Sequence, residues 1–212
     1  MKDVKSPAGS LRAERATITR DRIAQSARSL FAGRGYAATT LLAISVDAGV
    51  AVQTVYAVFG SKANILRTLL QALIDDPLAD AAFRAALGAP APFEALGHFS
   101  HSIRLRWQAG HDIVLILGDA ASADPALRAA LNDALAARRR GIGELALSLA
   151  GRDTGFANEA RTSAVIDALT VPEVYGRLVG AHGWNPDEYE AWLATALRRM
   201  VAESGQDTEL AG

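Results

Sequence analysis

The fold is decided by residues 39–66, which read TTLLAISVDAGVAVQTVYAVFGSKANIL. The apolar positions predict two short helices, one that carries Leu41, Ile44 and Ala48 and a second from about Ala51 to Ala57 or Val58. Between them stands Gly49, and a glycine permits the tight turn that joins two such helices. The stretch therefore predicts a helix-turn-helix that spans about Thr39 to Phe59.

The second short helix has one side suited to the interior and another suited to solvent. The apolar residues that can pack this pair of helices onto the preceding helix are Ile44, Val50, Val55 and Phe59. This packing leaves Gln53, Thr54 and Tyr56 exposed. A short exposed helix with polar and aromatic tips is typical of a recognition helix that enters the major groove of DNA.

A longer helix is expected before this motif. Thr19 is a plausible N-cap, with Asp21 in the first turn, and Gly35 ends the helix. Its apolar stripe at helical spacing consists of Ile23, Ala27, Leu30 and Phe31. Residues 1–16 are polar and without periodicity, which predicts a disordered basic arm.

Composition favours an all-α fold. Of the 212 residues, 50% are hydrophobic but only 6% are aromatic, and the strong helix formers Ala and Leu dominate. Cysteine is absent, which excludes disulfides and thiolate metal sites and suits a reducing interior. Residues 1–70 carry a formal charge of +6 and residues 71–212 carry −7. This division indicates a polyanionic partner for the first part, although small domains also differ in charge by chance.

The rest of the chain indicates more helices. They are expected near residues 78–87, 93–108, 110–122, 125–149, 156–180 and 186–203. Pro172 should start or kink a helix, and residues 205–212 look frayed. The run Arg138 to Arg140 is more typical of a solvated face than of a phosphate site. No apolar run reaches the roughly 18 to 20 residues of a membrane span, and no secretory signal is visible, so we expect a cytoplasmic protein with no membrane partner.

The segment from Thr19 to Leu66 closely resembles the DNA-binding region of the TetR (tetracycline-repressor) family. It covers about a quarter of the chain. The agreeing positions are Ala27, Leu30, Phe31, Gly35, Tyr36, Thr39, Thr40, Ile44, Ala48, Gly49, Val50, Thr54, Val55, Tyr56, Phe59, Ser61, Lys62 and Leu66. The resemblance implies a helix-turn-helix DNA-binding domain over residues 17–62, followed by a helical ligand-binding and dimerisation domain over residues 63–204.

The resemblance also implies roles for single residues in binding double-stranded DNA. Thr39, Thr40 and Lys62 would contact phosphates, and Arg20, with Arg15, would reach phosphates or the minor groove. On the recognition helix, Val52, Gln53, Thr54 and Tyr56 would face the DNA, where glutamine can pair with adenine and the Tyr56 ring can meet a thymine methyl group. Two alternatives stay open: Tyr56 as half-buried core, and Lys62 as a plain surface lysine.

Two positions depart from the family pattern. Ala51 stands where the family usually has a Ser or Thr that caps the recognition helix, a loss of about 1 kcal/mol. Val58 stands where a polar aromatic residue or a histidine is frequent. We expect DNA binding with fewer backbone contacts than is usual in the family.

For the second domain, the resemblance implies that the last two long helices pair with those of a second copy. The expected interface residues are Val165, Leu169, Tyr189, Trp192, Leu193 and Ala196. These apolar stripes could instead pack only within the monomer. The expected ligand pocket lies among the middle helices, with Phe99, His101, Arg104, Trp107, His111 and Leu115 as lining candidates. Taken singly, a Phe or Trp on a helix more often packs in the core than lines a pocket, and Arg104 is more readily explained by an ion pair with a nearby acidic residue than by an anionic ligand.

Together these observations predict a ligand-responsive transcriptional regulator, acting as a repressor, that binds a palindromic operator as a homodimer. The effector is an unknown small molecule. An activator is not distinguishable from a repressor by sequence. The alternative is a DNA-binding architectural or cell-cycle protein with no small-molecule effector. We expect no enzyme activity, because phosphate loops, nucleophile elbows and HExxH motifs are missing. No cofactor is expected, and no metal, since His98 and His101 lack a third ligand.

Overall fold

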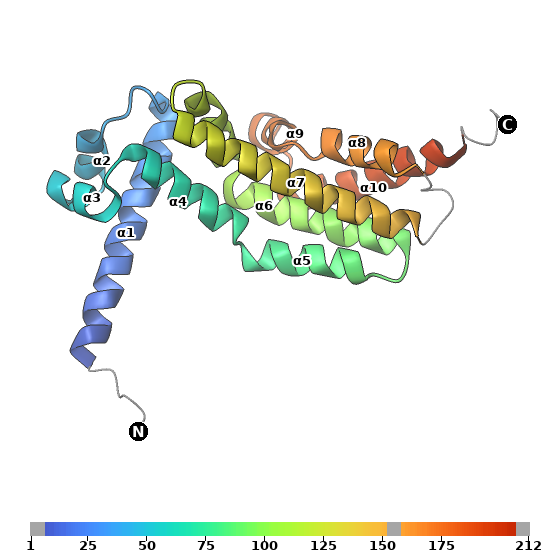
Figure 1. Cartoon of the computed structure of the whole chain (residues 1–212), viewed down its shortest axis with the longest axis horizontal. Helices are drawn as coiled ribbons and strands as arrows, with labels where there is room; N and C mark the ends of the chain where they lie inside the picture. Colours follow the sequence, from blue (N-terminus) through green and yellow to red (C-terminus); the bar gives the residue numbers. More distant parts are fainter. Residues whose placement is uncertain (1–6, 152–157, 207–212) are drawn as a thin grey trace. The chain divides into compact units, whose positions relative to one another are not determined.

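The computed structural model describes residues 7–151 and 158–206, and these are helices joined by short turns, with no strand among them (Figure 1). The all-α expectation is therefore confirmed. The first helices are α1 Pro7–Arg34, α2 Leu41–Asp47, α3 Val52–Phe59, α4 Lys62–Ile74 and α5 Pro77–Gly88. The remainder are α6 Pro92–Ala121, α7 Pro125–Ala150, α8 Glu159–Leu169, α9 Pro172–Tyr175, the π-helix Gly176–Ala181 and α10 Pro186–Gln206.

The chain divides into two compact units. The first comprises the described residues within Met1–Gln71 and Ile116–Arg128, and the second those within Ala72–Leu115 and Ala129–Gly212. The helix-turn-helix lies in the first unit. The end of α6 and the start of α7 also belong to the first unit, whereas the rest of those two helices belongs to the second.

In the first unit, α1 forms the support on which α2 and α3 pack. Its stripe Ile23, Ala27, Leu30 and Phe31 is buried, as the spacing predicts. Gly35 follows the helix at a φ of 82°, a left-handed conformation that favours glycine. The buried partners contributed by the motif are Ile44, Val55 and Phe59, and α4 adds Ile65 and Leu66. These contacts explain why α2 and α3, each of eight residues or fewer, are stable as helices.

The beginning of α1 corrects the sequence-based boundary. The helix begins at Pro7, not near Thr19, so residues 7–16 of the expected disordered arm are helical. Thr19 is not an N-cap, because its hydroxyl donates to the carbonyl of Arg15 one turn earlier at 2.9 Å. Most of the intervening residues, over 11–16, are Leu, Arg, Ala and Glu, which are good helix formers that outweigh Gly9, and proline is tolerated in a first turn. Residues 1–6 of the expected arm, like residues 207–212 of the expected frayed tail, lie outside the described residues, whereas Gln206 ends α10.

In the second unit, α5, α6, α7, α8 and α10 pack around a core of Ala, Leu and aromatic residues. Asp76 caps α5 by accepting from the backbone N–H groups of Leu78 and Ala79, and Pro77 begins the helix. The break expected between the helices near residues 93–108 and 110–122 is present at Gly110, whose backbone angles are non-helical within α6. Pro172 begins α9, as predicted. Within the described part of the chain, no single helix is long and apolar enough to cross a membrane, although the bent pair α2 and α3 together passes that test by length and composition.

Candidate nucleic-acid interface

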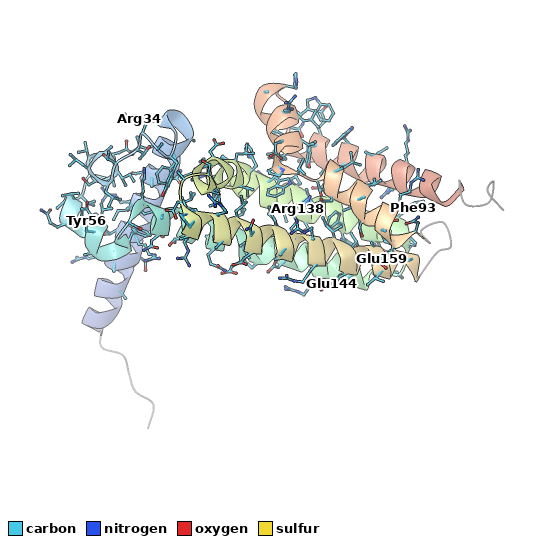
Figure 2. The ribbon with its side chains drawn as sticks, turned by 45° about the horizontal axis from the view of Figure 1, so that its top comes forward. Arg34, Tyr56, Phe93, Arg138, Glu144 and Glu159 are labelled. Atoms are coloured by element: carbon cyan, nitrogen blue, oxygen red, sulfur yellow. The ribbon has the colours of Figure 1, made fainter. Side chains whose placement is uncertain are left out.

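The outward face of α3 carries the side chains expected to read DNA. Gln53 and Tyr56 are exposed, whereas Val52 and Thr54 are half-buried. Tyr56 is 56% exposed and points away from the body of the first unit (Figure 2). The alternative in which Tyr56 belongs to the core is therefore wrong, and its phenol is open to a partner.

The turn before α3 depends on Gly49. Its φ of +64° is one that side-chain-bearing residues rarely adopt, and an added Cβ would lie 3.0 Å from a guanidinium nitrogen of Arg22. That guanidinium donates to the carbonyl of Ala48, the C-cap residue of α2. Sequence reasoning missed Arg22 because its partner lies 26 positions away. The arginine thus ties the turn to α1.

Thr40 caps α2. Its Oγ1 accepts a hydrogen bond from the backbone N–H of Ala43 at 3.1 Å, and the residue is exposed. The cap uses an oxygen lone pair, so the hydroxyl proton remains available to a phosphate oxygen.

Thr39, which was expected to contact a phosphate, is buried instead. It is 1% exposed, and its hydroxyl lies 2.9 Å from the carbonyl oxygen of Gly35 and 3.3 Å from that of Leu30. Because a hydroxyl has one proton, these carbonyls at the end of α1 occupy it. Thr39 closes α1 from the inside and is not placed to donate to a phosphate.

The Lys62 ammonium is also turned inward. Its Nζ donates to the carbonyl oxygens of Tyr36 at 2.7 Å, Thr39 at 3.1 Å and Ala37 at 3.3 Å, and lies 4.3 Å from the centroid of the Tyr36 ring. Three acceptors match the three protons of an ammonium. Lys62 is therefore neither a plain surface lysine nor a free phosphate contact: it fastens the start of α4 to the loop between α1 and α2.

Arg20 lies on the exposed side of α1. Its guanidinium sits 4.6 Å from the centroid of the Phe59 ring and donates to Thr68 Oγ1 at 3.3 Å. These two contacts bring α1, α3 and α4 together and use few of the five guanidinium protons. The remaining protons suit the phosphate contact expected of this residue.

The two departures from the family pattern are visible in α3. Ala51 occupies the N-cap with φ −66° and ψ 144°, and makes no side-chain cap hydrogen bond. Val58 is half-buried. Asn64, which the sequence analysis overlooked, donates from Nδ2 to the carbonyl of Phe59 at 2.9 Å and satisfies the C-terminal end of α3.

The six residues expected to line a ligand pocket lie in different surroundings within the second unit. Phe99 and Trp107 are buried core, and the Trp107 indole donates to the carbonyl of Thr170 at 3.0 Å. Leu115, in contrast, is 37% exposed. The structure thus does not bring the six into one cavity, because an α-helix turns successive large residues toward different neighbours.

His101 and Arg104 line an open groove of about 690 Å³ between α6 and α10. Both contact Glu190 Oε2 at 2.9 Å, from His101 Nδ1 and Arg104 Nε. Gly97 and Ala194 are among the small residues that also line the groove. The expected local ion pair of Arg104 is therefore present, with Glu190 as its partner.

A buried polar cluster lies around Tyr189 in the second unit. Tyr189 is fully buried, and its hydroxyl has no hydrogen-bond partner among the described residues. Burial raises its pKa above the ordinary value, and proximity to Tyr175 adds to the rise. The Tyr175 ring packs edge-on against it with centroids 4.9 Å apart, and the centroid of the His111 ring lies 5.2 Å from that of Tyr175. Sequence reasoning found His111 and missed both tyrosines as members of this cluster.

Arg138 joins α7 to α8 beside this cluster. Its guanidinium donates to Asp167 Oδ1 at 2.7 Å, to the carbonyl of Asp167 at 3.0 Å and to Thr170 Oγ1 at 2.7 Å. Burial lowers the pKa of Arg138, and the Asp167 carboxylate acts against that fall. The expectation of a solvated arginine run is wrong for this residue, whereas Arg139 and Arg140 are exposed.

The residues expected at a dimer interface divide into two groups. Tyr189 and Leu193 are fully buried within the chain, so they belong to its core and are not placed to contact a second copy. The others are half-buried: Val165, Leu169, Trp192 and Ala196. Trp192 pairs with Trp184 at 6.1 Å between ring centroids.

His98 and His101 face carboxylates rather than each other. His98 Nε2 lies 3.8 Å from Glu94 Oε1, and His101 pairs with Glu190. Among the residues that the structure describes, no group of three or more His, Cys, Asp or Glu side chains is arranged to hold a metal ion.

Comparison with known proteins gives two kinds of match. Residues 23–69 match the model of bacterial regulatory proteins of the tetR family. No curated protein sequence matches the chain. Among solved structures, the chain is similar to the fatty acid degradation regulator FadR from Bacillus halodurans, with 18% identity, a TM-score of 0.67, and coverage of 86% of this chain and 94% of that one.

Two other solved structures share the fold along most of their length. The TetR family transcriptional regulator PfmR from Thermus thermophilus is 23% identical, with a TM-score of 0.62 over 86% of this chain and 95% of its own. NalD, the secondary repressor of the MexAB-OprM multidrug efflux pump in Pseudomonas aeruginosa, is 21% identical, with a TM-score of 0.64 over 88% of this chain and 97% of its own. At these identities the likeness shows the fold. The match over residues 23–69, which covers the helix-turn-helix described above, identifies this segment as an N-terminal DNA-binding domain like that of bacterial regulatory proteins of the tetR family.

Proposed function

We propose that the protein is a ligand-responsive repressor that binds a palindromic operator as a homodimer. The observation that carries the DNA-binding part is the outward face of α3, where Gln53 and Tyr56 are exposed above a buried packing face. Thr40 and Arg20 keep protons available for phosphates beside this helix. Val52 and Thr54, both half-buried, lie at the edges of the same surface. The protein acts by binding, not by catalysis, with residues 17–62 as reader and residues 63–204 as sensor and dimerisation domain.

The dimer is proposed to form through α8 and α10. Val165, Leu169, Trp192 and Ala196 remain half-buried and are the residues we assign to the interface. A twofold axis through this interface relates two recognition helices, which reach successive major grooves when they lie about 34 to 36 Å apart. The operator is then a palindrome with half-sites about one helical turn apart.

The effector is proposed to act in the second unit, at the cluster around Tyr189. A buried hydroxyl without a partner is costly, and a ligand that accepts its hydrogen bond removes that cost. His111 adds a half-buried imidazole, and the π-helix Gly176–Ala181 follows Tyr175 directly. Such π-helical segments occur frequently at functional sites. The effector weakens DNA binding only if it binds more tightly to a dimer state in which the spacing of the recognition helices does not match successive major grooves.

The test is selection of bound duplexes from a random library with the purified full chain at about physiological salt. An enriched palindrome with half-sites one helical turn apart supports the dimeric regulator. Binding that is salt-sensitive but without sequence preference would instead favour the architectural or cell-cycle protein. If a sequence is enriched, its neighbouring genes supply candidate effectors. If no candidate effector at saturating concentration changes the affinity for the operator, the proposed ligand response is contradicted and the proposed DNA-binding role stands.

A further inference from the structure

The reading surface of α3 is unusual in its chemistry. Its exposed or half-exposed side chains outside the buried face include Ala51, Val52, Gln53, Tyr56 and Ala57. In a helix, positions four apart share a face, so Val52 lies over Tyr56 and Gln53 over Ala57. The surface therefore presents methyl groups, one carboxamide and one phenol, with the hydroxyl of half-buried Thr54 at its edge.

No positive charge is available within the motif itself. From Leu41 to Phe59 the sequence contains no Lys or Arg, and Asp47 is its one charged residue. Two cations whose side chains reach the motif are engaged with backbone carbonyls: Lys62 donates to three of them, and Arg22 donates to that of Ala48. Arginine and lysine make the commonest specific contact to guanine, through its O6 and N7 atoms. The α3 surface lacks this means of recognising G·C pairs.

The side chains that are present match A·T pairs. Glutamine pairs in a bidentate manner with N6 and N7 of adenine, and apolar side chains contact the thymine C5-methyl group. We infer that α3 recognises a half-site core of A·T pairs, in which Gln53 pairs with an adenine while Val52 and Ala57 contact thymine methyl groups. This inference rests on the proposed function, because it requires α3 to lie in the major groove.

The test uses base analogues in the duplex that the full chain selects. Replacing one thymine by deoxyuridine removes only the C5-methyl group, and replacing one adenine by 7-deazaadenine removes only the N7 acceptor. We expect deoxyuridine at one or more core positions to weaken binding by several-fold. We expect 7-deazaadenine at one position per half-site to weaken it by several-fold, which is less than the roughly 5- to 140-fold range for a whole bidentate contact, because the hydrogen bond from N6 remains.

Two variants assign these effects to residues. Gln53→Ala should abolish the response to 7-deazaadenine while the deoxyuridine response persists, and Val52→Ala should reduce the deoxyuridine response. Gln25→Ala, which truncates an exposed glutamine on α1, is the matched control and should change neither response.

The possible results separate this inference from the function on which it rests. A selected palindrome with a G·C core, or one indifferent to both analogues, would overturn the A·T assignment and leave the regulator intact. The absence of any selected sequence would overturn both. A selected A·T core that loses its 7-deazaadenine response in Gln53→Ala and has a smaller deoxyuridine response in Val52→Ala supports the assignment of Gln53 and Val52 as its readers.

Discussion

At the residue scale, Lys62 shows how a charged side chain can serve the fold instead of the partner. Lys62→Met keeps an unbranched stem of similar length and removes the donor shared by the carbonyls of Tyr36, Ala37 and Thr39. We expect the free energy of unfolding to fall by about 1–3 kcal/mol, measured by urea denaturation. Arg67→Met, on the exposed side of α4, is the control and should change stability little.

DNA binding distinguishes this role from a direct phosphate contact. If Lys62 only holds the loop before α2, Lys62→Met weakens all duplexes alike and leaves the dependence of affinity on salt nearly unchanged. A decrease of about one in the slope of log affinity against log salt concentration would contradict this role and assign the ammonium to a phosphate.

Tyr189 leads to a prediction about pH. Burial raises the pKa of its hydroxyl above the ordinary value of about 10, so the folded chain retains this proton where the unfolded chain loses it. The unfolded state is then favoured as the pH rises, and we expect stability to decline from about pH 10 upward. Unfolding followed across pH 8 to about 11 measures the decline, which Tyr189→Phe should reduce.

The same substitution tests the cost of the unpaired hydroxyl at neutral pH. Because Tyr189→Phe removes a buried donor that has no partner among the described residues, we expect stability at pH 7 to be unchanged or higher. A loss of more than about 1 kcal/mol would mean that the hydroxyl makes a stabilising hydrogen bond in solution.

At the scale of the element, the two helices of the motif differ in their caps. Thr40 caps α2 with its side chain, whereas Ala51 gives α3 no such bond. The backbone of Ala51 is extended, as an N-cap requires, so Ala51→Ser should stabilise the chain by about 0.5–1 kcal/mol. Thr40→Ala should destabilise it by about 1 kcal/mol. Thermal unfolding of both variants checks these two predictions. A change in stability of the same sign in both variants would contradict the assigned difference between the two caps.

The first helix shows a limit of capping signals in a sequence. Thr19 has the side chain of a good N-cap, yet it lies inside α1, where its hydroxyl bonds to the preceding turn. An N-cap signal requires that the residues before it leave the helical conformation. Residues 8–18 do not force the chain out of the helical conformation, because they contain no proline and no extended stretch of β-branched or aromatic residues.

At the scale of the whole molecule, the proposed dimer predicts a coupling between α10 and operator affinity. Ala196→Glu places a carboxylate in the half-buried face assigned to the interface, and we expect it to shift the protein to monomers in sedimentation velocity. Operator affinity should fall by at least about tenfold, since each half-site is then bound separately. Leu147→Glu, on an exposed position of α7, is the control and should leave the dimer intact. A monomeric control, or a dimeric Ala196→Glu, would place the interface elsewhere.

Local information in the sequence was sufficient for most of the helices, the turn and the identity of the side chains exposed on α3. Apolar spacing, Gly49 and Pro172 act over a few residues, so their effects can be predicted without knowing the partners. The exposure of Gln53 and Tyr56 followed from this periodicity.

Only the tertiary structure decided which side chains are free to bind. Lys62 is occupied by carbonyls 23 to 26 positions away, and His101 meets Glu190, which lies 89 positions along the chain. Tyr189 and Leu193 have the spacing of an interface stripe, but they fill the core of their own chain. The physical reason is that periodicity identifies the apolar face of a helix, whereas the partner of that face, or of a polar group, depends on how distant segments pack.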